Sequence, residues 1–238
     1  MKKRLTIVLL PLLLAGCFTG ETLNQWLGIG GQAARNLGYT DSAKMAEGIR
    51  QALSLGSERA GASLSREDGY ALAGYPVSLP PALQPVADTL KRVGMGSYVA
   101  RLETAMNRGV EQAAAEAVPV FKNAISNMSV TDALAIVQGG DSAATDYFRG
   151  QTEAGLRQRY QPIIRDNLDQ TGFYSQYRAL LNAYNALPLT SKPNLDIEQQ
   201  LLDHSLNALF GRLAEEERQI RAAPLARGSE LIGAVFGL

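Results

Sequence analysis

The sequence is poor in the residues that build cross-links and metal sites. Its 238 residues include one cysteine, one histidine and one tryptophan. A single cysteine excludes an intramolecular disulfide framework and a zinc site built from several cysteines. A single histidine excludes metal sites that need two or more of them. The fold must therefore be held together by its own core.

The chain also lacks an excess of charge of either sign. It carries 23 basic and 23 acidic residues, whereas a nucleic-acid-binding protein normally has a basic surplus. At 46% hydrophobic residues it is too apolar for a disordered protein. Residues 28–33 fit the G-x-G-x-x-A pattern of dinucleotide sites, but no predicted strand precedes them. We therefore expect neither a nucleic-acid partner nor a cofactor.

The N-terminus has the features of a secretory signal: a basic tip, an apolar run of about a dozen residues and small residues at its end. The run is too short to span a bilayer, which takes about 20 residues. Leu14-Ala15-Gly16-Cys17 matches the bacterial lipoprotein signal, and Cys17 is the only cysteine. We expect residues 1–16 to be removed and Cys17 to carry lipid; the alternative is a buried free cysteine.

The residues after Cys17 bear on the final location. Phe18, where inner-membrane lipoproteins often carry aspartate, resembles the pattern of lipoproteins sent to the outer membrane. Signal removal leaves 20 basic and 23 acidic residues, so lipid rather than a basic patch must provide the attachment. We expect a glycine-rich tether over residues 17–40, with Trp26 either at the membrane interface or packed on the body. One domain over residues 41–238 would then face the periplasm.

Apolar residues spaced three and four apart predict helices throughout that domain. We expect the connection over 67–81 to be extended, with at most one brief unpaired strand at Val77 and Leu79. The predicted fold is an all-α single irregular bundle of seven or eight helices without a sheet, with the helix from Ser142 at its centre. The expected helices cover 42–65, 82–93, 97–126 with a kink at Pro119, 129–137, 142–170 with a bend at Pro162, 173–187, 194–221 and 229–236.

Several stretches resemble one bacterial family, the family of unknown function numbered 4197. The resemblance covers roughly residues 47–237. It implies an all-helical envelope protein, often with a lipoprotein signal, and brings no known reaction or catalytic residues. The stretches that carry it are 52–56, 67–70, 136–149, 160–164, 184–188, 209–210 and 214–221.

The stretch 136–149 contains a turn between two predicted helices. We expect Gly139 and Gly140 to end the first helix with a positive φ, and Asp141 or Ser142 to cap the second. The alternative is an anion site at the start of the second helix. The carboxylate of Asp141 would repel an anion there, so the structural role is favoured.

The helix that follows carries a ladder of alternating charges. Asp146, Arg149, Glu153 and Arg157 are spaced by three, four and four residues, which predicts solvated ion pairs of about 0.2–0.5 kcal/mol each. As candidates for a ligand or partner site we single out Asp141, Asp146, Tyr147, Arg149 and Tyr177. No catalytic residue and no metal ligand is assigned.

Three further features have two interpretations each. Glu216 and Glu217 could be the paired carboxylates of a glycoside hydrolase, but we expect them to pair with Arg218 and Arg221. His204 lies away from the apolar stripe of its helix, which predicts an exposed side chain. Seven aromatic residues between Tyr147 and Tyr184 could line a pocket for an apolar ligand, although core is the commoner role.

These observations leave three functions open. The leading one is a non-catalytic envelope protein, anchored to the membrane through Cys17, that works by binding another protein of the envelope. The second is a carrier or sensor of an apolar or lipid ligand that uses the aromatic region. The third is a carboxylate-based hydrolase of envelope polymers.

Overall fold

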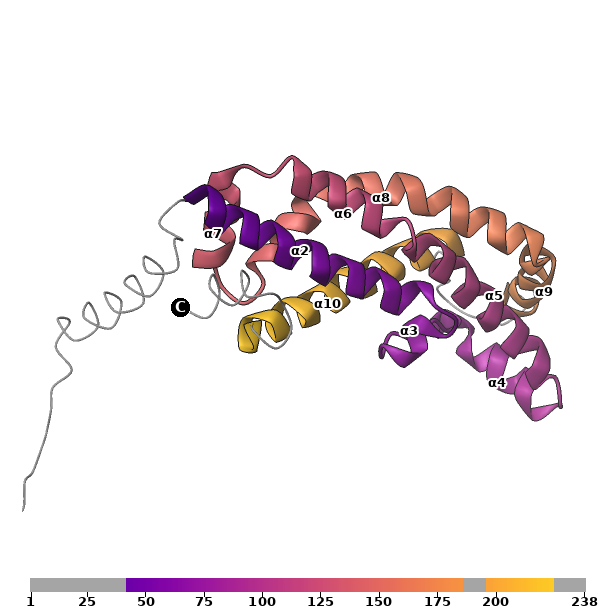
Figure 1. Ribbon diagram of the computed structural model, residues 1–238. Helices are drawn as coiled ribbons and strands as arrows, with labels where there is room; N and C mark the ends of the chain where they lie inside the picture. The colour runs from indigo at the N-terminus through magenta and orange to yellow at the C-terminus, as the bar shows by residue number, and fades with distance from the viewer. Residues whose placement is uncertain (1–41, 186–195, 225–238) are drawn as a thin grey trace, which may run out of the picture.

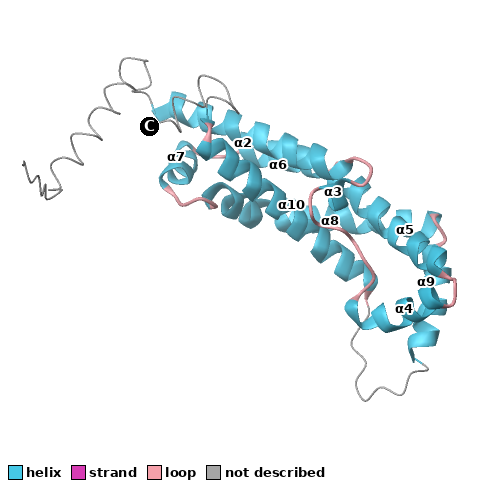
Figure 2. Ribbon diagram, turned by 90° about the horizontal axis from the view of Figure 1, so that it is seen from below, coloured by secondary structure: helices cyan, strands magenta, loops and turns pink. Residues whose placement is uncertain are grey.

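A computed structural model describes residues 42–185 and 196–224. In these two ranges the chain forms helices joined by short turns, with no strand (Figure 2). The all-α bundle predicted from the apolar spacing is therefore confirmed. The signal peptide, Cys17, the tether over 17–40, the end of the helix predicted over 173–187 and the helix predicted over 229–236 lie outside the described residues.

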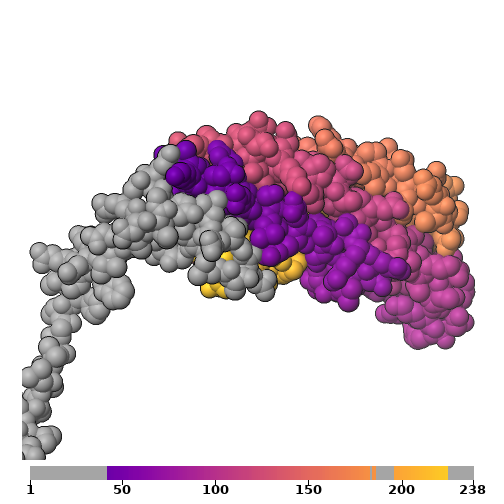
Figure 3. Space-filling model, in the orientation of Figure 1, coloured from indigo at the N-terminus to yellow at the C-terminus, as the bar shows by residue number. Residues whose placement is uncertain are grey.

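The helices build an elongated, arched body (Figures 1 and 3). Helices α2, α8 and α10 run along it, with α7 at one end and α4 and α9 at the other. The bounds are α2 Ser42–Ser65, α3 Gly69–Leu72, α4 Gln84–Arg92, α5 Gly96–Ala114, α6 Ala117–Ser126, α7 Val130–Gln138, α8 Ala143–Gln170, α9 Phe173–Asn185 and α10 Ile197–Ala222, with a 3₁₀ turn over Pro81–Leu83.

Helix α8 is the centre of the bundle, as its two apolar sides predicted. It packs against α5, α6, α7, α9 and α10. The ring of Phe148, which is fully buried, lies 5.1 Å from that of Phe121 on α6. Phe121 in turn lies 6.2 Å from Phe210 on α10, so three helices meet through aromatic side chains. The aromatic region is thus mainly core.

The predicted long helix over 97–126 is wrong in one respect, because the chain breaks it into α5 and α6. The amides of Ala115 and Glu116 donate to carbonyls three residues back, which tightens and ends α5. Pro119 then stands in the first turn of α6, where its missing N–H costs no helical hydrogen bond. The proline therefore helps to begin a new helix rather than kinking an existing one.

The connection over 67–81 also differs from its prediction at one place. Gly69–Leu72 forms a single helical turn, α3, after Asp68 adopts a left-handed conformation with φ of 57°. Val77 and Leu79 are buried without forming a strand. The side chain of Asn107 on α5 exchanges hydrogen bonds with the backbone N–H and carbonyl of Val77, at 3.3 and 2.9 Å, and so replaces a partner strand.

Among the helices of the two described ranges, none is long and apolar enough to cross a bilayer.

Candidate functional site

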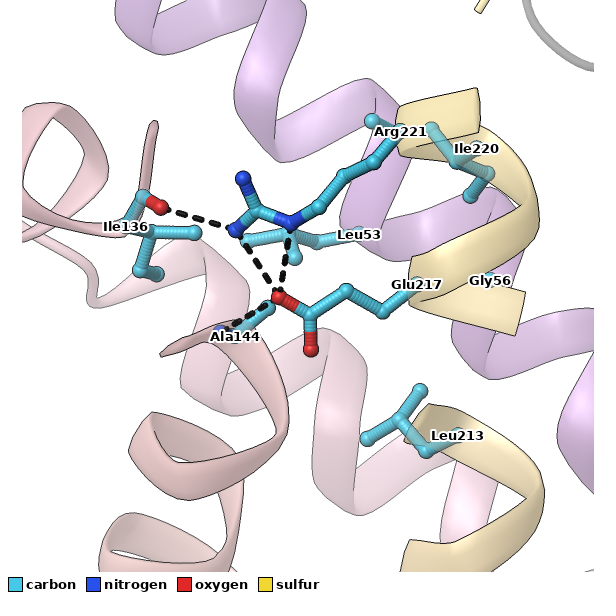
Figure 4. Close-up of a pocket in the computed structure, with 9 residues that line it drawn as sticks. Leu53, Gly56, Ile136, Ala144, Leu213, Glu217, Ile220 and Arg221 are labelled. Atoms are coloured by element: carbon cyan, nitrogen blue, oxygen red, sulfur yellow. Dashed lines mark hydrogen bonds and ion pairs between the residues drawn. The ribbon is translucent and has the colours of Figure 1, made fainter. Parts of the chain in front are cut away.

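The start of α8 is capped by Glu217, which lies more than 70 residues later in the chain. The amide of Ala144 donates to Oε1 at 3.0 Å, and the amide of Thr145 donates to Oε2 at 2.9 Å. The Thr145 hydroxyl donates to Oε2 at 2.8 Å. With 7% of its surface exposed, Glu217 occupies the site where unpaired amides and the positive end of the helix dipole favour an anion (Figure 4).

Arg221 joins this cap to α7. Its Nε and Nη2 donate to Glu217 Oε1 at 3.1 and 2.9 Å, and Nη2 also donates to the carbonyl of Ile136 at 2.9 Å (Figure 4). A guanidinium near the C-terminal end of α7 complements that helix dipole, as the carboxylate complements that of α8. Two of the stretches that carry the family resemblance, 136–149 and 214–221, therefore meet at one ion pair.

The prediction that Asp141 or Ser142 caps α8 is wrong. The Ser142 hydroxyl donates to Asp146 Oδ2 at 2.9 Å instead of accepting from the α8 backbone, and Asp141 is exposed. The physical reason is that Glu217 already satisfies the amides a local cap would serve. The side chains of the turn are consequently left to the solvent.

The predicted positive φ at the glycine pair is also wrong. Gly139 is extended, with φ of −79°, and Gly140 is not among the residues with positive φ. Gly139 is required for a different reason: a Cβ there would lie 2.5 Å from the Cβ of Ala143. The turn brings the end of α7 against the start of α8 so closely that residue 139 has no room for a side chain.

Beside the Glu217–Arg221 pair there is little space for a ligand. The cavity measures about 20 Å³, room for about one water molecule. Apart from the ion pair, its lining is apolar and comes from α2, α7, α8 and α10 (Figure 4): Ala52, Leu53, Gly56, Ile136, Ala144, Leu213 and Ile220. The start of α8 is therefore filled by protein rather than open to an external anion.

Three of the four charged residues predicted to form a ladder on α8 do pair with one another, and Asp146 does not. Glu153 pairs with Arg149 at 3.5 Å and with Arg157 at 2.9 Å. Arg157 reaches across to Asp203 on α10 at 2.6 Å. Asp146 bonds Ser142 rather than Arg149. The guanidinium of Arg149 lies 4.5 Å from the centre of the Phe210 ring, a cation–π contact that ties the ladder to the core.

The paired carboxylates do not face a common space. Glu216 is buried and accepts from Arg212 Nη2 at 2.7 Å, whereas Glu217 is held by Arg221 and the α8 backbone. Arg212, one turn before Glu216, takes the role expected of Arg218, which is exposed. Each carboxylate is therefore engaged in its own ion pair.

His204 is half-buried, and the prediction of an exposed side chain is wrong. Its Nε2 lies 3.1 Å from the carbonyl oxygen of Tyr75, and its ring centre 6.5 Å from that of Tyr70. The connection after α3 folds over this side of α10. The 100° spacing of helix residues places His204 away from the apolar face of α10, but the non-helical segment that contains Tyr75 covers that side.

The five candidate ligand or partner residues do not form one site. Asp141, Asp146, Tyr147 and Arg149 are close in sequence around the start of α8, but Asp146 bonds Ser142, Arg149 lies against Phe210 of α10 and Tyr147 faces α6.

Tyr177 lies on α9 toward the other end of the body (Figure 1). Its ring stacks on Phe173 at 5.1 Å, and burial, assisted by Asp196, raises its pKa to about 12. Tyr177 is therefore part of the core.

Tyr147 lines a surface groove that the sequence did not indicate. The groove measures about 370 Å³ and runs between α6 and α8, which lie side by side along the upper edge of Figure 1. Polar side chains of both helices line it: Asn123, Asn127, Gln151, Thr152 and Arg159. In the sequence these residues are only ordinary polar positions of two helices, separated by α7.

In the part of the chain that the structure describes, no three His, Cys, Asp or Glu side chains are grouped so that they could hold a metal ion.

The chain matches the family described as protein of unknown function (DUF4197) over residues 39–237. No curated protein and no solved structure matches the chain. Because the match covers more than half of the sequence, the chain belongs to the DUF4197 family.

Proposed function

We propose that this chain is a lipid-anchored protein of the bacterial cell envelope that works by binding another envelope protein and not by catalysis. The observation that supports the non-catalytic part of the proposal is that both family-motif carboxylates are paired inside the fold. Glu217 caps α8 and pairs with Arg221, and Glu216 pairs with Arg212. Both side chains are buried as well as paired, so neither is placed as an accessible general acid or base for a polymer substrate.

The anchoring part of the proposal rests on Leu14-Ala15-Gly16-Cys17 and the basic and apolar segment before it. Two or three acyl chains at Cys17 give stable attachment, where a single chain is marginal. The residue after Cys17 favours the outer membrane, with the helical domain in the periplasm.

Mass spectrometry of the mature N-terminus tests the anchor. We expect a chain that begins at Cys17 and carries the added mass of acyl groups. Replacing Cys17 by Ala should release the body from the membrane fraction or block processing of the signal. A mature chain with an unmodified Cys17, or one that begins elsewhere, contradicts the anchor.

Turnover assays test the absence of catalysis. Peptidoglycan fragments incubated with the purified full chain should remain intact, with the wild type and a Glu216→Gln variant indistinguishable. Cleavage by the wild type that the variant loses would establish a hydrolase instead. Lipid retained by the protein in native mass spectrometry would favour a carrier.

A further inference from the structure

The turn between α4 and α5 exposes apolar side chains. Among the described residues, four large apolar side chains are exposed: Leu72, Val93, Met95 and Val130. Two of the four, Val93 and Met95, flank Gly94 in this turn, with 67% and 45% of their surfaces exposed. A single apolar residue on a surface needs no explanation, but two beside one glycine form a small apolar patch. We call residues 91–96 the α4–α5 tip.

The α4–α5 tip is an ordered turn that protrudes from the body, at the lower right of Figure 1. Gly94 has a φ of 83°, a left-handed conformation in which the chain leaves the helix. The amides of Gly94 and Met95 donate to the carbonyls of Lys91 and Leu90 at 3.2 and 2.8 Å. Because the backbone of the tip is already fixed, burying its apolar side chains in another phase orders little additional chain.

The chain around the tip carries positive charge that no carboxylate neutralises. Residues 89–102 include three basic residues, Lys91, Arg92 and Arg101, and no acidic one. Within the described ranges none of the three forms an ion pair, whereas most of the other arginines there pair with a carboxylate. The side chains of all three are exposed, so their charge is open to an external anion.

Lys91 and Arg92 also have a structural explanation. Both lie in the last turn of α4, where a positive charge complements the helix dipole. Arg92 donates to the backbone carbonyl of Asp88 and the hydroxyl of Thr89, at 3.4 and 3.1 Å. This role accounts for basic residues at a helix end, but not for the exposed apolar side chains beside them. A protruding surface that is both apolar and cationic matches the interface of a bilayer with anionic headgroups.

The anchor described under the proposed function would bring the tip within reach of a bilayer. The α4–α5 tip lies at one end of the elongated body, and α2 begins at the other end (Figures 1 and 2). The 24 residues 18–41 between Cys17 and α2 can span at most roughly 80 Å. Helix α8, which runs along the body, is only about 42 Å long. A chain held at Cys17 can therefore lie along the leaflet and touch it with the tip.

We propose that the α4–α5 tip inserts into the surface of an anionic phospholipid bilayer, so that the body contacts the membrane at a second point besides its anchor. Val93 and Met95 enter the boundary between headgroups and acyl chains, and Lys91 and Arg92 bind the phosphates there. This inference rests on the lipid anchor of the proposed function and not on its protein partner. Because even one myristoyl chain binds a membrane only marginally, the tip orients a body that Cys17 already holds at high local concentration.

An environment-sensitive dye at residue 93 tests insertion. Cys17 is the only natural cysteine, and lipid blocks its thiol, so Val93→Cys provides a single thiol for the dye. The control is Leu72→Cys, because Leu72 is equally exposed at 67% but follows the acidic residues Glu67 and Asp68. The lipidated full chain is reconstituted in vesicles of phosphatidylethanolamine and phosphatidylglycerol, of which the second supplies the negative charge.

Quenchers attached to the acyl chains should reduce the emission at residue 93 at least about twofold more than at residue 72. Lys91→Glu should remove most of this difference, whereas Lys44→Glu, the same change at an exposed lysine of α2, should preserve it. If Lys91 only stabilises the end of α4, its substitution will lower the melting temperature and leave the quenching unchanged, which contradicts the proposal.

Flotation of the vesicles separates failure of the tip from failure of the anchor. Equal quenching at residues 72 and 93, or none at 93 in a chain that floats with the vesicles, overturns the tip assignment and leaves the anchor intact. A chain that does not float contradicts the anchor and, with it, the role of the tip. A photo-crosslinker that replaces Met95 in cells should form adducts with phospholipid, and adducts with a polypeptide alone would show that the tip binds a protein instead.

Discussion

The side chain of Glu217 replaces the local cap that α8 lacks. Because it also holds Arg221, which bonds α7, its loss should lower the stability of the contact among α7, α8 and α10. Glu217→Ala leaves the amides of Ala144 and Thr145 and the guanidinium of Arg221 without their carboxylate. Removing one partner of a buried ion pair costs about 3–5 kcal/mol, and we expect a loss near the lower end because Arg221 keeps some exposure. Urea unfolding measures this loss.

The neighbouring Arg218 provides the control for Glu217. It is exposed on the same helix, and Arg218→Ala should change stability by no more than about 0.5 kcal/mol. Equal unfolding midpoints for the two alanine variants would show that the cap contributes nothing measurable.

The two glycines of the α7–α8 turn should respond differently to the same substitution. Gly139→Ala places a Cβ 2.5 Å from that of Ala143, and forcing α7 and α8 apart should cost about 1–3 kcal/mol. Gly140→Ala meets nothing within 4 Å and should melt like the wild type. Thermal melts of the two variants decide this, and an equal drop for both would contradict the close-approach explanation.

The sequence predicted the turn between α7 and α8, but not that Glu217 caps the helix that follows it. Two glycines followed by Asp141 and Ser142 are typical of a helix end and a new cap, which is why local rules placed the cap there. Glu217 carries no local signal for this role, since it sits inside another helix more than 70 residues later. Only the packing of α10 against α8 creates the cap.

At the scale of the elements, the ion pair between Arg157 of α8 and Asp203 of α10 should make stability depend on pH. Burial acts to raise the pKa of Asp203, but hydrogen bonds from Gln199 and Arg157 outweigh it and hold that pKa below its usual value. The pair therefore stabilises the fold fully above the unfolded pKa of about 4, and this contribution is lost as the pH falls through the lower folded value.

An Asp203→Asn variant tests this link between α8 and α10. Because both side chains are partly exposed, the loss near pH 7 should be only about 0.2–1 kcal/mol. The stability curves of variant and wild type should begin to converge as the pH falls below the unfolded pKa of about 4 and should meet below the lower folded pKa, as measured by urea unfolding at a series of pH values. A difference that stays constant down to pH 2 would mean that the carboxylate charge is not the cause.

Helix boundaries show where local pattern suffices and where packing decides. Helix α2 spans Ser42–Ser65, as its apolar spacing predicted. The break between α5 and α6 has no such signal, because Ala115 and Glu116 are good helix formers. After the break α6 lies against α2, where Gly61 leaves room for the side chain of Val118: a Cβ on Gly61 would lie 2.5 Å from it.

For the molecule as a whole, the sequence could predict the class of fold but not the surface groove between α6 and α8. Periodicity gives the helices and their apolar faces, and therefore the bundle. The groove arises where α6 and α8 lie side by side, with α7 between them in the chain. Tyr147 was a candidate through its motif, whereas Gln151 and Gly155 acquire meaning only when the two helices are placed together.

The elongated body should nevertheless unfold as one unit. A single hydrophobic cluster includes Ala133 on α7 at one end and Tyr177 on α9 at the other, and α8 contributes to it along its whole length. Because α8 packs against helices at both ends of this core, unfolding should be cooperative. Thermal melts followed by helix circular dichroism and by the near-ultraviolet signal of the buried tyrosines should coincide, and calorimetric and van't Hoff enthalpies should agree. Two separated transitions would instead mean that the α7 end and the α9 end are independent folding units, and that α8 links them without making them cooperative.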